Sequence, residues 1–460
     1  MLDTTLAPQD IVVGGDMGNV EVLQQFQKAL TAGSGVDAAN FTGGRALIPE
    51  SLENTLVNVL WTQDEARLFQ RIKKQPIPSP VHQWDKRTAV GSGAGAWVPE
   101  GGQSQEADQT INRVFETAKY LQTLRKATLQ ATLSNMIENA LTIEQNAGAL
   151  WIIREVERAM FYGDDRFFPE QPKGIKQQAT SNIFDARGAS ASSSTVENLI
   201  NDASRSIRDN YGKGSVMLMS TRVTQDIQNL IRDRVRFQSG NEVGTSVFRE
   251  YPTPFGTLEL LDDVFIQEGT VPSPSPLTSL RPGAITINSA TAAASSASQF
   301  TAGDAGDYFY RVVGVNRYGE GPSTASTAVT VAQGDGVTLN VDAAAPAPTA
   351  YALYRSERGA ADANDCRFVG YFEYTDGTGD TFVDVNAQLP GTSDIFILTM
   401  DEIYDAIEWF QFLPMMKFDL YPTNEAVYPF LMLLFGALAL KKEEQHAYIR
   451  NVSPADLSWF

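Results

Sequence analysis

The spacing of apolar residues predicts one long helix and several shorter ones. Between 134 and 162 the apolar positions recur at alternating three- and four-residue steps, and Ser134 is suited to cap the first turn. At ~1.5 Å per residue this helix would span roughly 40 Å and act as the spine of a domain. Shorter helices are predicted over residues 20–32, 51–74, 195–210, 222–234 and 401–408.

Other stretches carry the spacing of strands and turns. The pattern over 81–132 predicts a long β-hairpin, with a glycine-rich tip around 91–102 that contains few core-forming residues. Such a tip should project from the body and needs a partner surface to hold it. Residues 166–194 are expected to form a loop. Short strands beside the helices of a small α/β unit are predicted over 215–219, 256–261 and 264–266.

The composition changes near residue 270, where three prolines and two serines between 270 and 276 indicate a linker. From 281 to 394 there are 13 acidic residues against 6 basic ones, none of them lysine. Short strands separated by turns at intervals of roughly ten residues predict an inserted all-β sandwich over 277–394. The chain then returns to the earlier core, and the apolar run Val427–Leu440 is too short to span a bilayer and is predicted to be buried.

Composition limits the function. The formal net charge is −19, from 36 basic and 55 acidic residues, which argues against a general nucleic-acid binder. The single cysteine, Cys366, excludes an intrachain disulfide, and it lies far in sequence from His82 and His446. No metal site and no cofactor are therefore expected. The first residues lack the basic stretch and apolar core of a signal peptide, and no membrane partner is expected.

Catalytic motifs are missing from the sequence. It contains no nucleophile elbow, no Walker loop and no dinucleotide-binding glycine motif. Acidic pairs such as Asp164–Asp165 and Asp262–Asp263 are interpreted as solvated turns, with a metal or acid–base role as the minor alternative. Both histidines are expected at the surface. The sequence thus predicts a protein that is not an enzyme and has no catalytic residues.

Candidate contact residues come from the hairpin, from one basic cluster and from the first fifty residues. A solvent-exposed tryptophan in a projecting hairpin is costly unless a partner covers it, although packing within the hairpin is an open alternative. The basic cluster is interpreted as interface or solvated charge, with DNA contact less favoured. The candidates for inter-subunit contact are Trp84, Trp97, Glu100, Arg113, Arg71, Lys73, Lys74 and Phe26.

The order of these elements, with a few local motifs, resembles the major capsid protein of tailed bacteriophages, which has the Hong Kong 97 type fold. The motifs are Gly95–Gly101 at the hairpin and the apolar finish Phe430–Leu440, followed by Ala447–Asn451. The resemblance covers residues 1–270 and 395–460 in layout, and it implies an α+β fold.

The resemblance gives each segment an expected role. In this family the arm and the hairpin contact neighbouring subunits. Lys86 lies in the loop whose lysine cross-links some relatives, but no motif identifies a partner asparagine or a glutamate, so that activity is not carried over. The expected domains are an N-terminal arm (1–50), a helix leading into the core (51–75), the extended hairpin loop (76–132), a peripheral domain with the spine helix (133–194), an axial domain (195–276), the inserted sandwich (277–394) and a return to the axial and peripheral domains (395–460).

The resemblance also implies partners. The chain would bind itself, as hexamers and pentamers of an icosahedral or prolate head shell enclosing a double-stranded DNA genome. Further expected partners are a separate scaffolding protein, the portal and a decoration or cement protein. Packaged DNA would touch the inner face without sequence specificity. The protein would assemble in the host cytoplasm and reside in the virion.

Within the insertion, residues 310–323 and 351–356 resemble late and early strands of fibronectin type III or immunoglobulin-like modules, in an order that suggests permutation. Such insertions typically decorate the shell exterior. Two other functions stay open: an encapsulin-type nanocompartment shell, and a surface adhesion or carbohydrate-binding protein. In the last case sugars would stack on Tyr308, Tyr310, Tyr318 and Tyr354, although core packing explains most of these residues.

Overall fold

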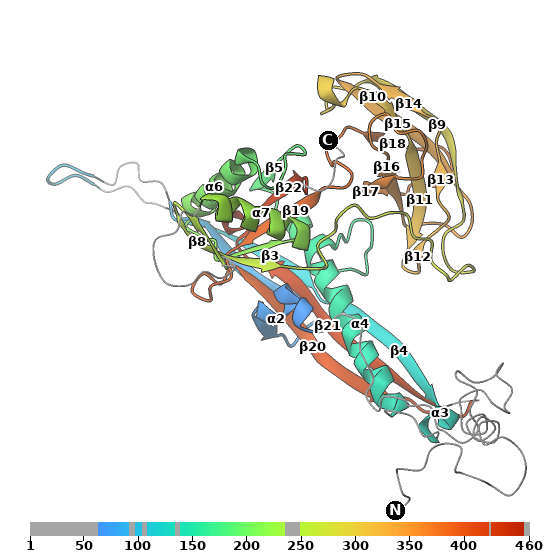
Figure 1. Ribbon diagram of the computed structural model, residues 1–460. Coiled ribbons are helices and arrows are strands. Elements are labelled where there is room, and N and C mark those ends of the chain that lie inside the picture. The colour runs from blue at the N-terminus through green and yellow to red at the C-terminus, as the bar shows by residue number, and fades with distance from the viewer. Residues whose placement is uncertain are drawn as a thin grey trace, which may run out of the picture. The chain divides into compact units, whose positions relative to one another are not determined.

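The computed structural model describes residues 63–91, 97–103, 108–133, 139–234, 249–422 and 425–454 (Figure 1). The predicted arm with Phe26 lies outside these residues, as does the first half of the helix predicted over 51–74. The described part combines helices with mixed and antiparallel sheets, so the α+β class is confirmed. Hairpin, spine helix, α/β unit, insertion and return follow one another in the order on which the resemblance rested.

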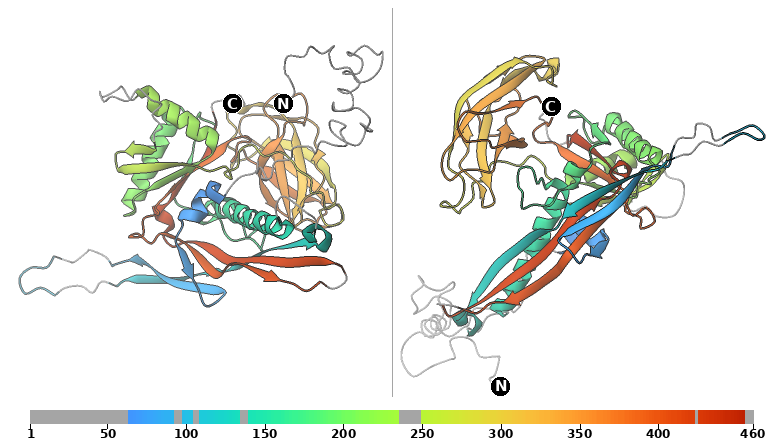
Figure 2. Two further views of the ribbon diagram at one scale, coloured as in Figure 1. Left: turned by 60° about the horizontal axis from the view of Figure 1, so that its bottom comes forward. Right: turned by 180° about the vertical axis from the view of Figure 1, so that it is seen from behind.

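A four-stranded sheet and a long helix form one part of the body. The strands lie in the order β1 (Lys74–Pro76), β20 (Ile407–Asp419), β21 (Val427–Leu440) and β4 (Lys119–Thr128). Figure 2 shows β20 and β21 (orange-red) beside β4 (cyan). Helix α4 (Ala140–Tyr162) packs on β4 and β21 through a core that includes Ile152, Val156 and Met160. The spine helix is thus confirmed from Ala140 onward, while 134–138 lie outside the described residues.

A second sheet, of six strands, forms the predicted α/β unit. Its order is β5 (Ile183–Asp185), β22 (Ala447–Val452), β19 (Ser393–Leu398), β6 (Val216–Met219), β8 (Gly256–Asp262) and β7 (Glu250–Thr253). Its helices are α6 (Ser194–Asp209) and α7 (Thr221–Arg234). Neighbouring strand residues point to opposite faces. Met217 and Ile397 share a core with α6 and α7, whereas Leu218 and Phe396 share the core that contains α4. The strands after the insertion therefore complete the sheet begun before it.

The hairpin consists of β2 (Val81–Ala89) and β3 (Thr110–Thr117), and its return leg is shorter than predicted. After Ala118 the chain enters β4, which pairs with β21 of the four-stranded sheet and no longer with β2. The prediction was wrong here because alternating apolar and polar residues fit either neighbour equally well. The short helix α3 (Leu129–Leu133) follows β4.

Several short segments also differ from the predictions. Where one helix was expected up to Lys74, α2 spans only Arg67–Arg71, because Ile72 is extended and leads into β1 beside β20. The helix expected over 401–408 is a turn followed by the start of β20, and 264–266 is a turn and not a strand. The loop expected over 166–194 contains α5 (Ile175–Gln178) and β5. Single 3-10 turns are η2 (Gln63–Glu65), η3 (Ala302–Asp304) and η4 (Glu443–Gln445).

The insertion folds as antiparallel sheets around one core. One sheet contains β9 (Ile285–Ala294), β15 (Asp335–Ala343) and β18 (Asp380–Asp384). The second contains β11 (Tyr310–Asn316), β12 (Gly319–Glu320), β13 (Thr324–Ala325), β16 (Ala350–Arg355) and β17 (Arg367–Glu373), and a further pair is β10 (Gly306–Tyr308) with β14 (Val329–Val331). Val312, Leu339 and Leu353 belong to the core between the two larger sheets. The likeness to fibronectin or immunoglobulin modules and the domain boundaries stay predictions.

Candidate inter-subunit surface

One face of the hairpin packs on the body of the same chain. The His82 ring lies 4.1 Å, centroid to centroid, from the Phe410 ring of β20, and the Trp84 ring lies 5.6 Å from the same phenyl group. Two residues further along β2, Lys86 Nζ lies 2.9 Å from Glu444 Oε1. Trp84 therefore packs on the body of the same chain, whereas the alternative that the sequence left open was packing within the hairpin.

The opposite face of the hairpin is exposed in the described chain, and we call it the hairpin outer face. Phe115 and Ile111 on β3 are 63% and 51% exposed, and Val81 on β2 is exposed beside them. Arg113 Nε donates to Asp85 Oδ1 at 2.9 Å, and this hydrogen bond holds the pKa of Asp85 below its usual range. Cross-strand pairing places all five side chains on one face. Such a cluster of exposed apolar groups is typical of a surface that another polypeptide covers.

The hairpin tip is described over residues 97–103. Trp97 is 97% exposed there, and Glu100 is exposed as well. Tryptophan anchors protein interfaces because its indole buries a large apolar area, and the exposed indole of Trp97 has this area free for a partner. The structure thus separates the two hairpin tryptophans: Trp84 is packed inside the chain, and Trp97 is available to a partner.

A second exposed apolar face lies on the four-stranded sheet. Tyr120 and Leu124 on β4 are exposed, whereas the intervening Leu121 packs toward the core that contains α4. Pairing places Leu124 beside Leu431 of β21, which in turn lies beside exposed Phe418 of β20. These side chains form the sheet outer face. Sequence reasoning missed it because the alternation in β4 was assigned to the hairpin.

The predicted basic cluster is paired within the chain. The Arg71 guanidinium forms a bidentate ion pair with Glu259 on β8, in which Nη2 lies 2.7 Å from Oε1. Lys73 Nζ lies 3.1 Å from Asp405 Oδ1 and also contacts Glu408. Lys74 Nζ lies 4.1 Å from the centroid of a phenyl ring on α2. These contacts hold α2 and β1 to their neighbours, and a role in inter-subunit contact stays a prediction.

Two residues predicted at the surface are buried. His446 accepts the Thr399 amide at Nδ1 over 3.3 Å, and its Nε2 lies 3.3 Å from Ala406 O. Burial lowers the pKa of His446 to about 4, so the ring is neutral at pH 7. Asp263 is also fully buried, so its interpretation as a solvated turn was wrong. Asp164 does form the expected turn, accepting the Arg166 amide.

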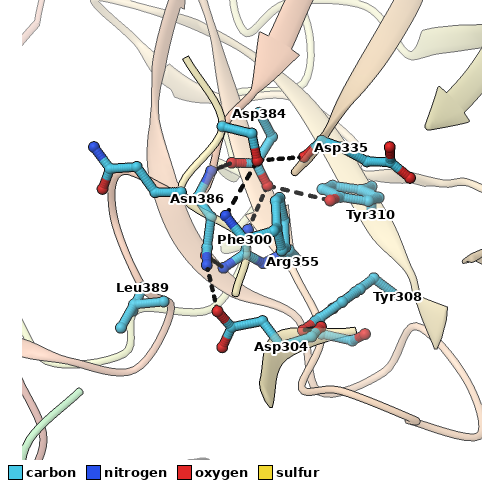
Figure 3. Close-up of polar contacts among 12 residues, drawn as sticks. Phe300, Asp304, Tyr308, Tyr310, Asp335, Arg355, Asp384, Asn386 and Leu389 are labelled. Atoms are coloured by element: carbon cyan, nitrogen blue, oxygen red, sulfur yellow. Dashed lines mark hydrogen bonds and ion pairs between the residues drawn. The ribbon is translucent and has the colours of Figure 1, made fainter. Parts of the chain in front are cut away.

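The tyrosines of the insertion lie largely in its interior. Figure 3 shows the Arg355 guanidinium paired with the Asp384 carboxylate, and the Tyr310 hydroxyl donating to Asp384 Oδ2 at 3.2 Å. The guanidinium also lies beside the Phe300 and Tyr308 rings, 5.2 and 5.4 Å from their centroids. Tyr308 and Tyr310 are buried in this core, and Tyr354 is buried in a separate cluster with Val313 and Cys366. Three of the four tyrosines proposed for sugar stacking are therefore inaccessible to a carbohydrate ligand.

The described residues were also searched for metal-binding groups and membrane spans. Across the described ranges, no three His, Cys, Asp or Glu side chains lie close enough together to hold a metal ion. Within the same part of the chain, no helix is both long and apolar enough to cross a membrane. The single thiol, Cys366, is buried in the insertion, and burial raises its pKa to about 11.

Comparison with known proteins points to one family. A family model described as SU10 major capsid protein matches residues 25–276. The major capsid protein of Staphylococcus phage K is 25% identical over 449 residues, covering 93% of this chain and 96% of the relative. A solved structure of Mycobacterium phage Bobi has a TM-score of 0.46 at 10% identity, over 88% of this chain and 96% of that one. The holo-SrpI encapsulin complex from Synechococcus elongatus has a TM-score of 0.44 at 8% identity, over 90% and 96%. The sequence matches favour a phage capsid over the encapsulin alternative.

Proposed function

The chain belongs to the SU10 major capsid protein family and is a structural subunit of a phage capsid, and we propose that the hairpin outer face is its main contact with a neighbouring copy. Copies joined in this way form hexamers and pentamers of a closed icosahedral or prolate head. The head encloses the double-stranded DNA genome. A closed assembly of identical chains requires that each copy present complementary surfaces to its neighbours.

The observation that carries this proposal is the difference between the two hairpin faces. The inner face is fixed to the body through Phe410 and Glu444, so the hairpin is held in place before any partner binds. The outer face keeps Phe115, Ile111 and Val81 in contact with water. Covering these groups is favourable by ~25 cal/mol per Å² of apolar surface. A prearranged apolar surface also loses little conformational entropy on binding.

The sheet outer face is the proposed receiving surface on the neighbouring copy. Tyr120 and Leu124 on β4 and Phe418 on β20 present apolar groups on either side of β21, where a two-stranded ribbon can lie flat. Both surfaces include exposed apolar groups, and on the hairpin outer face Arg113 and Asp85 already pair with each other. Docking therefore leaves no charge of this pair without a partner.

Introducing negative charges on the hairpin outer face tests whether this face makes the contact between copies. In the double variant Ile111→Asp and Phe115→Asp, two exposed apolar groups become carboxylates, so the isolated subunit should fold while assembly is lost. Val383→Asp is the matched control, because Val383 is an exposed strand residue of the insertion. Sedimentation velocity would show shells for the native chain and the control, and small species for the double variant. Shells of unchanged yield from the double variant would refute the proposed contact.

We further propose the position of the insertion and the remaining partners. The acidic insertion lies on the capsid exterior, away from the polyanionic genome, because its 13 acidic residues against 6 basic ones would repel DNA. Packaged DNA touches the inner face without sequence specificity. A scaffolding protein, the portal and a decoration protein bind the shell, which assembles in the host cytoplasm. The subunit acts as a structural protein without catalysis.

A further inference from the structure

Two fully buried carboxyl groups meet where α2, α4 and the six-stranded sheet join. Glu157 lies on α4, and Asp263 directly follows β8, where its amide donates to Met219 O. Glu157 Oε1 accepts the Leu68 amide at 2.7 Å, and Oε2 accepts the Phe69 amide at 2.8 Å. One side chain of the spine helix thus holds the first turn of α2.

The hydrogen bonds around the two carboxyl groups indicate a proton between them. Asp263 Oδ1 accepts the Phe265 amide at 2.8 Å, whereas Asp263 Oδ2 is buried and lacks a well-placed donor among the described groups. Protonated Glu157 supplies that donor while its oxygens still accept the two amides of α2. Two adjacent carboxyl groups in an apolar interior avoid double ionisation by sharing one proton. Burial raises the pKa of Glu157 well above its usual range, and Asp263 raises it further.

The charged groups that surround the pair do not replace this proton. Lys74 on β1 is close enough to interact with Glu157, but burial lowers its own pKa and its amine lies over a phenyl ring of α2. Arg67 on α2 directs its backbone amide toward Asp263. Asp262 on β8 adds a negative charge beside the pair, and the buried Tyr162 hydroxyl on α4 is uncharged at pH 7. None of these residues forms a salt bridge with Glu157 or Asp263 in the described part of the chain.

We propose that Glu157 and Asp263 share one proton and act as a clamp that fastens α2 to α4 and to the six-stranded sheet. In an opened clamp Glu157 meets water and regains a pKa of about 4.3, so opening releases the proton at any higher pH. The opening equilibrium therefore rises by up to about tenfold per pH unit above about pH 4.3. It levels off where the pH reaches the pKa of the closed pair. The clamp is therefore more stable at acidic than at alkaline pH. This pH dependence does not rely on the proposed contact between the hairpin and a neighbouring copy.

Hydrogen exchange of the full-length, unassembled subunit tests the clamp. The Leu68 and Phe69 amides should lose protection by up to about tenfold per pH unit between about pH 5 and the pKa of the pair, after correction for intrinsic exchange. Glu157→Gln keeps the size and one of the two acceptor oxygens but cannot ionise, so protection at the amide that this oxygen still holds should become independent of pH. Glu155→Gln, on the same helix and partly exposed, is the matched control and should keep the native slope.

Two outcomes would overturn the clamp. One is a native slope at the Leu68 and Phe69 amides no steeper than that at the Gly163 amide, which closes the last turn of α4. The other is a native slope that persists in Glu157→Gln. If Glu157→Gln does not fold, Asp263→Asn serves instead, because it removes the negative charge that further raises the pKa of Glu157, so the slope should end at a lower pH than in the native chain. The native protein should show a protonated carboxyl band in its infrared spectrum at neutral pH, and in Asp263→Asn this band should disappear at a lower pH than in the native protein.

Discussion

Lys86 Nζ lies 2.9 Å from Glu444 Oε1, and this ion pair joins the hairpin to the segment that precedes β22. The pair lies on the same hairpin face as Trp84, so it helps to decide which face meets the body and which face is left for another copy. Both side chains are partly exposed, so their contribution to folding stability is screened by water and salt.

Lys86→Ala is expected to lower the free energy of unfolding of the isolated subunit by less than about 1 kcal/mol. Because screening weakens an exposed pair, the difference from the native chain should shrink further at high salt. Thermal unfolding at low and high salt measures both effects. A loss of several kcal/mol that salt leaves unchanged would mean that the lysine has a structural role beyond this ion pair.

The two hairpin tryptophans should respond differently to substitution. Trp97→Ala should leave the stability of the subunit within about 0.5 kcal/mol of native, because its side chain is 97% exposed, but it should weaken assembly. Trp84→Ala should cost about 1–3 kcal/mol, because it removes a half-buried ring that packs on Phe410. Thermal unfolding combined with light scattering separates the two effects. If Trp97→Ala assembled normally, the hairpin tip would not be a contact.

The subunit should become less stable in acid because of His446. The pKa of His446 is lowered to about 4 by burial, whereas in the unfolded chain it returns to about 6.5. Between these pH values the His446 ring is protonated in the unfolded chain but neutral in the folded chain. The free energy of unfolding therefore falls as the pH drops from about 6.5 to about 4, and then levels off. At 1.36 kcal/mol per unit the loss approaches about 3 kcal/mol.

Chemical unfolding at several pH values, for the native chain and for His446→Gln, measures this contribution. The titrating carboxylates are common to both chains, so the difference between their curves isolates the histidine. The native curve should fall more steeply between about pH 6.5 and 4. Parallel curves would show that His446 does not titrate on unfolding.

Removing only one partner of the buried ion pair between Arg355 and Asp384 should strongly destabilise the insertion. Arg355→Met leaves Asp384 charged and without its guanidinium in the interior, which should cost about 3–5 kcal/mol. The double variant Arg355→Met and Asp384→Leu removes both charges and should regain much of that loss. Calorimetry of the three chains tests the coupling. A double variant no more stable than Arg355→Met would mean that the two charges do not depend on each other.

The sequence predicted the elements whose spacing has only one explanation. The spine helix follows from its three- and four-residue steps, and the apolar run Val427–Leu440 is buried over most of its length, as predicted, here as β21 with Tyr428 exposed. Strand β9 was missed because Ile285–Ala294 is rich in Ala, Ser and Thr, which pack on a sheet without a strong apolar signal. The start of β20 was taken for a helix because 401–408 is short and its spacing is ambiguous.

The candidate surface was predictable only in part. For Trp97 the sequence left open whether a partner or the hairpin itself covers the ring, and the structure shows it exposed. The outer positions Ile111 and Phe115 were not singled out, since which face of a hairpin is covered depends on distant residues such as Phe410 and Glu444. The burial of Asp263 depends in the same way on Glu157, more than one hundred positions earlier, so no local pattern reveals it.

The most direct test of the proposed assembly is an electron cryo-microscopy map of particles formed by the full-length chain. The map should show closed shells in which the hairpin of each copy lies on the four-stranded sheet of its neighbour. Phe115 and Ile111 should be covered there, and the insertion should lie on the outside. Particles in which the hairpin outer face stays in solvent, or a chain that stays monomeric at high concentration, would contradict the proposed contact.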